Sequence, residues 1–238
     1  MPSNFESENM NKVQVVVTGA GKGIGFELCE VFSTLGCEVL AISRQHNPAF
    51  QGQNIYHIQA DIANAESTAN QINKLFPSGH STLRVLLHNA GVLINKPFET
   101  LSFEEMTTMI GVNYLFPMYL TQKLMPWLRQ SSQAHTLYIG SMGGFQGSVK
   151  YPGLTVYGST KAAGAGFIEG LASEYAGSRL YFNALSLGAV QTDMLKEAFP
   201  SLQDSLDVET ICNWIAKFAL EGFKVMNGQN LPISLGNP

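Results

Sequence analysis

Two kinds of segment alternate along the chain. One is a short run of apolar residues, and the other is a longer segment in which apolar residues recur with helical spacing. Runs rich in Val, Ile and Leu predict buried strands at Lys12 to Thr18, Glu38 to Ser43, Ile55 to Ala60, Arg84 to His88 and Thr136 to Gly140. Helical spacing fills the intervals at Ile24 to Leu35, Glu66 to Phe76, Phe103 to Asn113 continuing through Arg129, and Thr155 to Ala176. The pattern ends with a strand at Leu180 to Leu187, a helix near Val208 to Leu220 and a strand at Leu231 to Leu235.

This alternation predicts an α/β fold, a Rossmann-like doubly wound parallel sheet of about seven strands flanked by helices on both faces. No linker or repeat divides the chain, so we expect a single domain over 12–238. We expect the tail, 1–11, to be disordered or a consequence of start-site choice. Ligands bind such sheets beyond the carboxyl ends of the strands, so the residues that follow each strand are the candidates for a site.

Composition excludes several classes of protein. Apolar residues make up 45% of 238 positions and charged residues 13%, which suits a sheet buried under helices. The net charge of -4, without a Lys/Arg cluster, indicates no nucleic-acid partner. The three cysteines lack CxxC spacing, so neither a disulfide framework nor a metal site is expected. No apolar run approaches the roughly 18 residues of a membrane span, and no signal peptide is apparent, so we expect a cytoplasmic protein without a membrane partner.

A glycine-rich turn follows the first predicted strand. It reads Thr18-Gly19-Ala20-Gly21-Lys22-Gly23-Ile24-Gly25. Without β-carbons the backbone can turn sharply and approach a pyrophosphate at a helix N-terminus, although such a turn can also be only a tight connection. The strict GxGxxG pattern is absent. The TGxxxGxG pattern resembles the short-chain dehydrogenase/reductase family, including members like 3-oxoacyl-acyl-carrier-protein reductase, and the resemblance extends over nearly the whole chain.

The end of the second strand bears on the choice of cofactor. A carboxylate there would bind the adenine ribose 2′-hydroxyl and select NAD, but this chain has Ser43 and Arg44. Arg44 can bind a 2′-phosphate through paired, charge-assisted hydrogen bonds, and Lys22 can add a second cation. We therefore expect NADP(H), with the alternative that Arg44 is a solvated loop residue.

The resemblance implies further cofactor contacts after the third and fourth strands. Asp61 and Ile62 stand at the family's adenine-contacting position, although an Asp there can equally cap a helix. Asn89-Ala90-Gly91 matches the family's NAG motif beside the cofactor. The residue ahead of that motif is usually Asn but is His88 here, and we interpret it as a packing variation rather than a catalytic base.

The loop after the sixth strand departs from the family pattern. Leu187-Gly188 replaces the usual Pro-Gly, so proline no longer fixes φ and we expect a less rigid loop. Gly188 and the backbone groups near Val190 and Thr192 are still expected to contact the cofactor, where the resemblance implies binding of the nicotinamide carboxamide.

Tyr157 and Lys161 are the core of the expected catalytic set. They are four residues apart in a helical pattern, so their side chains share one face. A free tyrosine has a pKa of about 10, and a neighbouring ammonium favours its phenolate. We expect Tyr157 to protonate a carbonyl oxygen as hydride arrives from the nicotinamide, and to act in reverse during oxidation. The resemblance implies that Lys161 also holds the nicotinamide ribose.

Two further residues complete the catalytic set. Ser141 follows the fifth strand, where its hydroxyl can bind the substrate oxygen, and it matches the family's catalytic serine. Asn113 matches the helix asparagine that in the family holds a water linking the lysine to solvent. Asn is a poor choice within a helix, and it can alternatively mark a bend between two helices.

Residues expected around the substrate are mainly apolar. They lie in Met142 to Pro152, which contains Tyr151, and after Thr192, where the chain has Met194, Leu195, Phe199 and Leu202. With no evident basic cluster, we expect a small or medium apolar ketone, aldehyde or 3-oxoacyl group as substrate.

The helix from Thr155 carries small residues that would let another helix approach closely. They are Ala162, Ala163, Gly164, Ala165, Gly166 and Gly170. We expect a homodimer or homotetramer, with packing on the chain's own sheet as the alternative.

The expected function is NADP(H)-dependent interconversion of a carbonyl and a secondary alcohol. Two alternatives remain open at this point, an NAD-preferring alcohol dehydrogenase and a non-catalytic NADP(H)-sensing binding protein. The intact set of Ser141, Tyr157 and Lys161 argues against the sensor.

Overall fold

The computed structural model describes residues 13–45, 47–50, 54–75, 82–199 and 205–235. The statements below concern those ranges. The expectations for the tail 1–11, for Lys12, for Phe76 and for Leu202 lie outside the described residues.

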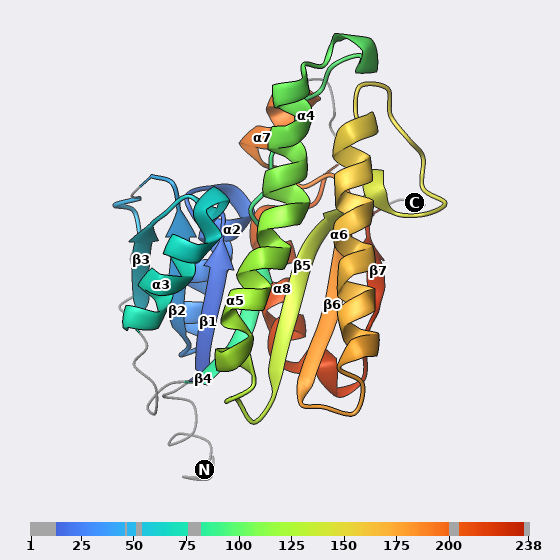
Figure 1. The fold of residues 1–238 in the computed structure, drawn as a ribbon. Coiled ribbons are helices and arrows are strands. Elements are labelled where there is room, and N and C mark those ends of the chain that lie inside the picture. Colours follow the sequence, from blue (N-terminus) through green and yellow to red (C-terminus); the bar gives the residue numbers. More distant parts are fainter. Residues whose placement is uncertain (1–12, 46, 51–53, 76–81, 200–204, 236–238) are drawn as a thin grey trace.

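Seven parallel strands form one sheet in the order β3-β2-β1-β4-β5-β6-β7 (Figure 1). Their bounds are β1 Val13–Thr18, β2 Glu38–Ser43, β3 Ile55–Gln59, β4 Thr82–His88, β5 Ala134–Ser141, β6 Leu180–Leu187 and β7 Asn230–Ile233. The chain winds outward from β1 to β3 and then returns to place β4 on the other side of β1. The predicted doubly wound fold is confirmed, and its switch point lies between β1 and β4.

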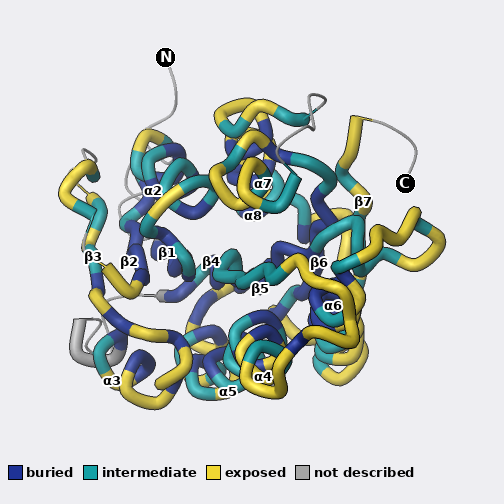
Figure 2. The backbone as a smooth tube through the Cα atoms, turned by 90° about the horizontal axis from the view of Figure 1, so that it is seen from above, coloured by how far each residue is buried: buried dark blue, intermediate teal, exposed yellow. Residues whose placement is uncertain are grey.

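Helices cover both faces of the sheet (Figure 2). One face carries α2 Gly23–Thr34 and α8 Val208–Glu221, and the other carries α3 Ala65–Leu75, α5 Phe116–Leu128 and α6 Thr155–Glu174. Two shorter helices, α4 Phe103–Ile110 and α7 Asp193–Ala198, lie at the carboxyl end of the sheet (Figure 1). Short 3-10 turns occur at Ile62–Asn64, Phe98–Thr100, Met142–Gly144 and Gly222–Lys224. Among the described helices, none combines the length and the apolar character needed to cross a membrane.

The core consists of two apolar layers that share the strands between them. Val15 and Val17 of β1 pack into the layer under α2 and α8, whereas Val16 packs into the layer under α3, α5 and α6. Both faces of the strands are thus buried. This explains why they appear in the sequence as nearly continuous apolar runs.

The structure corrects the expected continuous helix from 103 to 129. A π-helical turn, Gly111–Leu115, separates α4 from α5, and its N–H to C=O bond runs from Phe116 to Gly111. An α-helical bond to the Asn113 carbonyl would need the N–H of residue 117, which is Pro117. The missing donor is a physical reason for the irregular turn at this point.

The glycine turn between β1 and α2 packs directly on the end of β4. Gly19 has φ +70°, and a Cβ there would lie 2.6 Å from the Cα of Ala90. A Cβ on Gly25 would lie 2.3 Å from the Gly19 carbonyl oxygen and 2.4 Å from Nδ2 of Asn89. These two glycines bring the turn, the helix N-terminus and the following strand together at the switch point.

Gly25→Ala is expected to lower the free energy of unfolding by about 1 to 3 kcal/mol, because the added methyl has no room. Lys217→Ala is the control, since Lys217 also lies within a helix but is exposed. It should change the free energy of unfolding by less than about 0.5 kcal/mol. Urea unfolding followed by circular dichroism measures both changes, and equal effects would contradict the packing described for the turn.

Candidate active site

A cleft of about 1000 Å³ opens at the carboxyl ends of the strands, at the switch between β1 and β4. Most of the expected cofactor residues line it: Gly19, Gly21, Lys22, Gly23, Ile24, Ser43, Arg44, Asp61, Ile62, Asn89, Ala90, Gly91, Tyr157, Lys161 and Thr192. The other expected cofactor residues, Gly25, Gly188 and Val190, lie outside the lining. Gly25 contributes from behind through its close packing on Gly19.

Asn89 holds the glycine turn in place. Its Nδ2 donates hydrogen bonds of 3.2 Å to the carbonyls of Thr18 and Gly19. The Thr18 hydroxyl oxygen in turn accepts from the backbone N–H groups of Asn89 and Ala90, also at 3.2 Å. The amide of Asn89 therefore binds the protein's own backbone and fixes the cleft wall.

The end of β2 carries an exposed cation, Arg44, beside a serine that is already bonded, and Lys22 in the glycine turn lines the same cleft. The Ser43 hydroxyl donates to the Gln45 carbonyl at 2.6 Å and lies 2.8 Å from Nε2 of His57. It is only 8% exposed, so its main contribution is to shape the turn rather than to donate to a ligand. Arg44 and Lys22 both line the cleft with exposed side chains, where a phosphate can reach them.

Asp61 acts as a cap, the alternative considered from the sequence. Its Oδ1 accepts a 3.0 Å hydrogen bond from the N–H of Ala63 at the start of the turn Ile62–Asn64. Asp61 and Ile62 also line the cleft, so the capped turn holds both residues in the part of the cleft where the adenine is expected.

Tyr157 and Lys161 lie together in the interior at the start of α6, with exposed fractions of 8% and 4%. The Lys161 Nζ lies 5.9 Å from the centre of the Tyr157 ring and donates a 2.8 Å hydrogen bond to the Ile139 carbonyl. Burial lowers the pKa of Lys161 to about 8. Burial also raises the pKa of Tyr157, against which a hydrogen bond with Ser141 acts, so the phenol is protonated near neutral pH.

Asn113 connects three parts of the site and is fully buried. Its Oδ1 accepts from the Val92 N–H at 2.8 Å, and its Nδ2 donates to the Val92 carbonyl at 2.9 Å. The same Nδ2 donates at 3.0 Å to the Thr160 hydroxyl, which donates at 2.7 Å to the Tyr157 carbonyl. Asn113 thus marks the bend, as considered above, and also fixes the backbone of Tyr157. Its link to solvent through a water stays a prediction.

His88 is a packing residue, in agreement with the interpretation of the sequence. It is 1% exposed, and its Nε2 lies 2.8 Å from the Thr121 hydroxyl, which donates to the Pro117 carbonyl at 2.8 Å. Because that hydroxyl hydrogen is used, Nε2–H is the donor to Thr121. Burial lowers the pKa of His88 to about 3, so the ring is neutral.

The loop after β6 is anchored without the family's proline. The Gly188 N–H donates a 2.8 Å hydrogen bond to the Ile233 carbonyl, and Val190 forms a parallel bridge with Leu206. The Thr192 hydroxyl accepts from the Leu195 N–H at 3.3 Å and caps α7, a helix too short for its periodicity to be recognised. The expectation of a less rigid loop is therefore not supported by its bonding.

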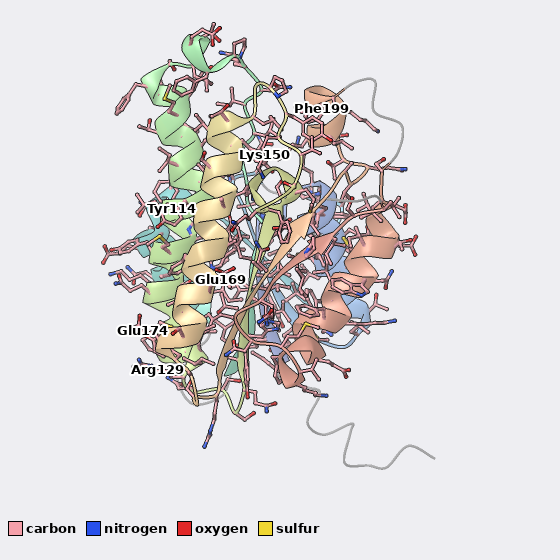
Figure 3. The ribbon with its side chains drawn as sticks, turned by 90° about the vertical axis from the view of Figure 1, so that its right-hand side faces the viewer. Tyr114, Arg129, Lys150, Glu169, Glu174 and Phe199 are labelled. Atoms are coloured by element: carbon pink, nitrogen blue, oxygen red, sulfur yellow. The ribbon has the colours of Figure 1, made fainter. Side chains whose placement is uncertain are left out.

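An apolar cluster packs against Tyr157. Leu101, Met109 and Leu154 pack with Tyr157, and partly buried residues extend the cluster: Val92, Leu93, Ile94, Met106, Val156 and Phe199. Tyr151, expected in the substrate wall, meets Phe199 edge to face at 6.0 Å between ring centres. Figure 3 shows Phe199 and Lys150 at the same end of the molecule. Lys150 folds back and donates to the Ser148 hydroxyl at 2.8 Å.

Two residues that support the reacting groups were missed from the sequence. Thr160 stands next to Lys161 and bonds both Asn113 and Tyr157. Tyr138, on β5, donates from its hydroxyl to the Asn113 carbonyl at 2.7 Å. A threonine in a helix carries no signal of such a role, whereas a tyrosine within a buried strand needs a partner for its hydroxyl and could have been noticed.

Comparison with sequences of known proteins gives a consistent result. A family model described as short chain dehydrogenase matches residues 13–203. An uncharacterized oxidoreductase from Staphylococcus saprophyticus is 31% identical over 195 residues, 78% of either chain. NADP-dependent 3-hydroxy acid dehydrogenase YdfG from Escherichia coli O6:H1 is 32% identical over 154 residues, 62% of this chain and 60% of that protein. Oxidoreductase BOA17 from Botryotinia fuckeliana is 26% identical over 186 residues, 74% of this chain and 65% of that protein. The alignments with YdfG and with BOA17 thus each span less than two thirds of the relative's length.

Solved structures share the fold over almost the entire chain. The 3-ketoacyl-(acyl-carrier-protein) reductase from Brucella melitensis, complexed with NADH, superposes with a TM-score of 0.84 at 21% identity, covering 94% of this chain and 97% of that one. ElxO with NADP bound superposes with a TM-score of 0.82 at 24% identity, covering 93% and 97%. With the family model matching most of the sequence, the chain belongs to the short-chain dehydrogenase/reductase family of oxidoreductases.

Proposed function

We propose that this oxidoreductase is NADP(H)-dependent and interconverts a carbonyl and a secondary alcohol, with Tyr157 as general acid/base. One observation carries the proposal. Tyr157 and Lys161 lie together at the carboxyl edge of the sheet and line a cleft that begins at a helix N-terminus. An acid/base, a nearby cation and a cleft that reaches both are what hydride exchange at a carbonyl requires.

The cleft fits a dinucleotide on features of this chain. Gly19 and Gly25 let the glycine turn pack against Ala90 and the start of α2 without steric overlap, and the N-terminus of α2 has no acidic residue in its first turn. Such a helix start favours a pyrophosphate through its N–H groups and its dipole. When bound, the nicotinamide cofactor supplies hydride in the reductive direction or accepts it in the oxidative direction.

The residues of the chain handle the proton. In reduction the Tyr157 hydroxyl donates its hydrogen to the substrate's carbonyl oxygen, and the Ser141 hydroxyl can donate to the same oxygen. The phenolate left behind is stabilised by the ammonium of Lys161. In oxidation an ionised Tyr157 takes the proton of the alcohol. Because burial raises the pKa of Tyr157, the oxidative rate should increase with pH until Tyr157 ionises.

The preference for NADP(H) rests on the charge of the cleft. Arg44 after β2 and Lys22 in the glycine turn are exposed cations that line it, and the Asp61 carboxylate caps the turn Ile62–Asn64. Two cations favour a 2′-phosphate over a 2′-hydroxyl. One relative is named as NADP-dependent and ElxO has NADP bound, which supports the same choice, although the Brucella reductase is complexed with NADH.

The side chains that line the cleft with Tyr157 support a small or medium apolar ketone, aldehyde or 3-oxoacyl group as substrate. Val92, Val112 and Met194 contribute only hydrocarbon and thioether surface there. Lys150, the nearest candidate for binding an anion, donates instead to the Phe145 carbonyl and the Ser148 hydroxyl.

We further propose that a second copy of the chain covers the outer face of α5 and α6. Among the small residues of α6, Gly164 and Ala165 pack inward, whereas a Cβ on Gly166 or Gly170 meets no atom within 4 Å. The adjoining groove of about 320 Å³ has a largely apolar lining that includes Leu115, Met118, Tyr119, Met125, Phe167 and Leu171. Figure 3 shows Glu169 and Glu174 on α6 and Arg129 near the end of α5. A face with apolar surface and both signs of charge can be self-complementary.

Tyr157→Phe is expected to lower kcat for carbonyl reduction by at least about 100-fold, because the proton donor is lost. NADPH oxidation against a panel of carbonyl compounds measures this. The matched control is Tyr151→Phe, which removes the hydroxyl of an exposed tyrosine packed on Phe199 and should retain most of the activity. Equal activity of Tyr157→Phe and the wild type would contradict the assignment. If the wild-type protein binds NADPH, reduces none of the carbonyl compounds and binds a partner protein when NADPH is present, it is a sensor and not an enzyme.

Arg44→Ala is expected to raise the KM for NADPH by roughly 10- to 100-fold while leaving the KM for NADH nearly unchanged, since only NADPH offers a phosphate to the guanidinium. Arg179→Ala, in an exposed turn before β6, is the control and should change neither value. A wild-type protein that prefers NADH would remove the NADP(H) assignment.

Gly170→Trp is expected to convert the assembly into a monomer, because a bulky ring on the outer face of α6 blocks a second copy. Light scattering after size-exclusion chromatography should give the wild type at least twice the mass of one chain. Lys217→Trp, on the exposed side of α8, is the control and should leave the mass unchanged. A monomeric wild type would rule out the proposed assembly.

A further inference from the structure

Tyr138 lies beneath the reacting groups but cannot touch a ligand in the cleft. It belongs to β5, three residues before Ser141, and is 1% exposed. Burial raises the pKa of its hydroxyl, which therefore remains a neutral donor. A buried tyrosine of this kind acts through what its hydroxyl and its ring contact.

The hydroxyl supplies a donor that the helix backbone lacks. The Asn113 carbonyl would accept from the N–H of residue 117 in a regular α-helix, and Pro117 has none. The Tyr138 hydroxyl donates to that carbonyl at 2.7 Å. Tyr138 therefore secures the π-helical turn whose Asn113 side chain fixes Val92 and, through Thr160, Tyr157.

The ring lies next to the buried ammonium. Lys161 Nζ is 5.2 Å from the centre of the Tyr138 ring and 5.9 Å from that of Tyr157. Its hydrogen bond to the Ile139 carbonyl comes from the residue after Tyr138. An aromatic face within about 6 Å attracts a cation, most strongly where water is excluded. Two rings and one carbonyl thus offset part of the cost of burying this charge.

A glycine makes room for the ring. Tyr157, Lys161 and Gly164 lie on one stripe of α6, at positions i, i+4 and i+7. A Cβ on Gly164 would lie 2.3 Å from Cζ of Tyr138 and 2.4 Å from its hydroxyl oxygen. Glycine within a helix lowers stability by about 1 kcal/mol relative to alanine, so its presence here is matched to the large side chain opposite.

We propose that Tyr138 is a positioning residue for the reaction: its ring holds Lys161 in the charged form beside Tyr157, and its hydroxyl holds the Asn113 turn. The proposal rests on the acid/base role proposed for Tyr157 and Lys161. In this role Tyr138 supports the charge of Lys161 and the position of Tyr157.

The direction of the effect follows from the groups around Lys161. The rings of Tyr157 on α6 and Tyr138 on β5 are the titratable groups placed beside its ammonium, and Lys22, Arg44, Asp61 and Asp193 line the same cleft. Removing the Tyr138 ring takes away an attraction for the ammonium, so the pKa of Lys161 falls. Because the pKa of Lys161 is about 8 and burial raises that of Tyr157, Lys161 loses its charge before Tyr157 ionises, and the effect appears in the titration of Lys161.

Tyr138→Leu is expected to shift the ionisation of Lys161 to lower pH by about 0.5 to 1 unit. NMR titration of protein labelled with carbon-13 lysine measures that ionisation without substrate, and the Lys161→Met variant identifies the signal. The pH above which kcat for carbonyl reduction declines should fall by the same amount. Tyr138→Phe keeps the ring and should keep the wild-type ionisation, while kcat falls roughly 2- to 10-fold through loss of the bond to the Asn113 carbonyl.

Phe182→Leu is the matched control, since Phe182 is a 1% exposed aromatic residue on β6 in the same apolar layer. It should lower Tm without moving the ionisation of Lys161. If Tyr138→Leu does not fold, Gly164→Ala displaces the ring instead and should give the same shift to lower pH, with Gly166→Ala as its control. Ionisation of Lys161 unchanged in the folded Tyr138→Leu or Gly164→Ala protein would overturn the proposal. A shifted ionisation in a protein that turns over no carbonyl would uphold the positioning role and refute the proposed function.

Discussion

Lys161 places an ammonium group in the interior, where burial disfavours its charge, and much of the surrounding structure compensates for that. The Ile139 carbonyl accepts one of its hydrogens at 2.8 Å, and two aromatic rings lie within about 6 Å. Strand β5 provides both the carbonyl and one ring, and α6 provides the lysine and the other ring. The pKa of about 8 shows that compensation is incomplete, which leaves the charge of Lys161 sensitive to small changes nearby.

A second constraint comes from the backbone of the helix that faces α6. Pro117 removes the N–H that would bond the Asn113 carbonyl, and the π-helical turn exposes that carbonyl to β5. The turn also directs the Asn113 side chain toward Val92 and Thr160. An irregularity in one helix therefore fixes a strand end, a neighbouring helix and a buried tyrosine at the same time.

The fold was accessible from the sequence because both faces of the strands are buried and the helices are long and periodic. The location of the candidate site could also be predicted from the sequence, because ligands of such sheets bind at the carboxyl ends of the strands, at the switch point. What the side chains do there was less accessible. Ser43 and Asn89 line the cleft as expected, and the structure also shows the Ser43 hydroxyl and the Asn89 Nδ2 bonded to the chain itself. The partners of Asn89, and His57 beside the Ser43 hydroxyl, come from distant segments, so neither periodicity nor motif spacing encodes them.

The close fit between Tyr138 and Gly164 constrains how this protein can change over evolutionary time. Enlarging residue 164 first leaves no space for the ring, and shrinking residue 138 first leaves a void and an unbonded carbonyl. Either single step passes through a less stable protein. Descendants of this sequence are therefore expected to keep both residues or to replace both, so that the two positions behave as one inherited unit.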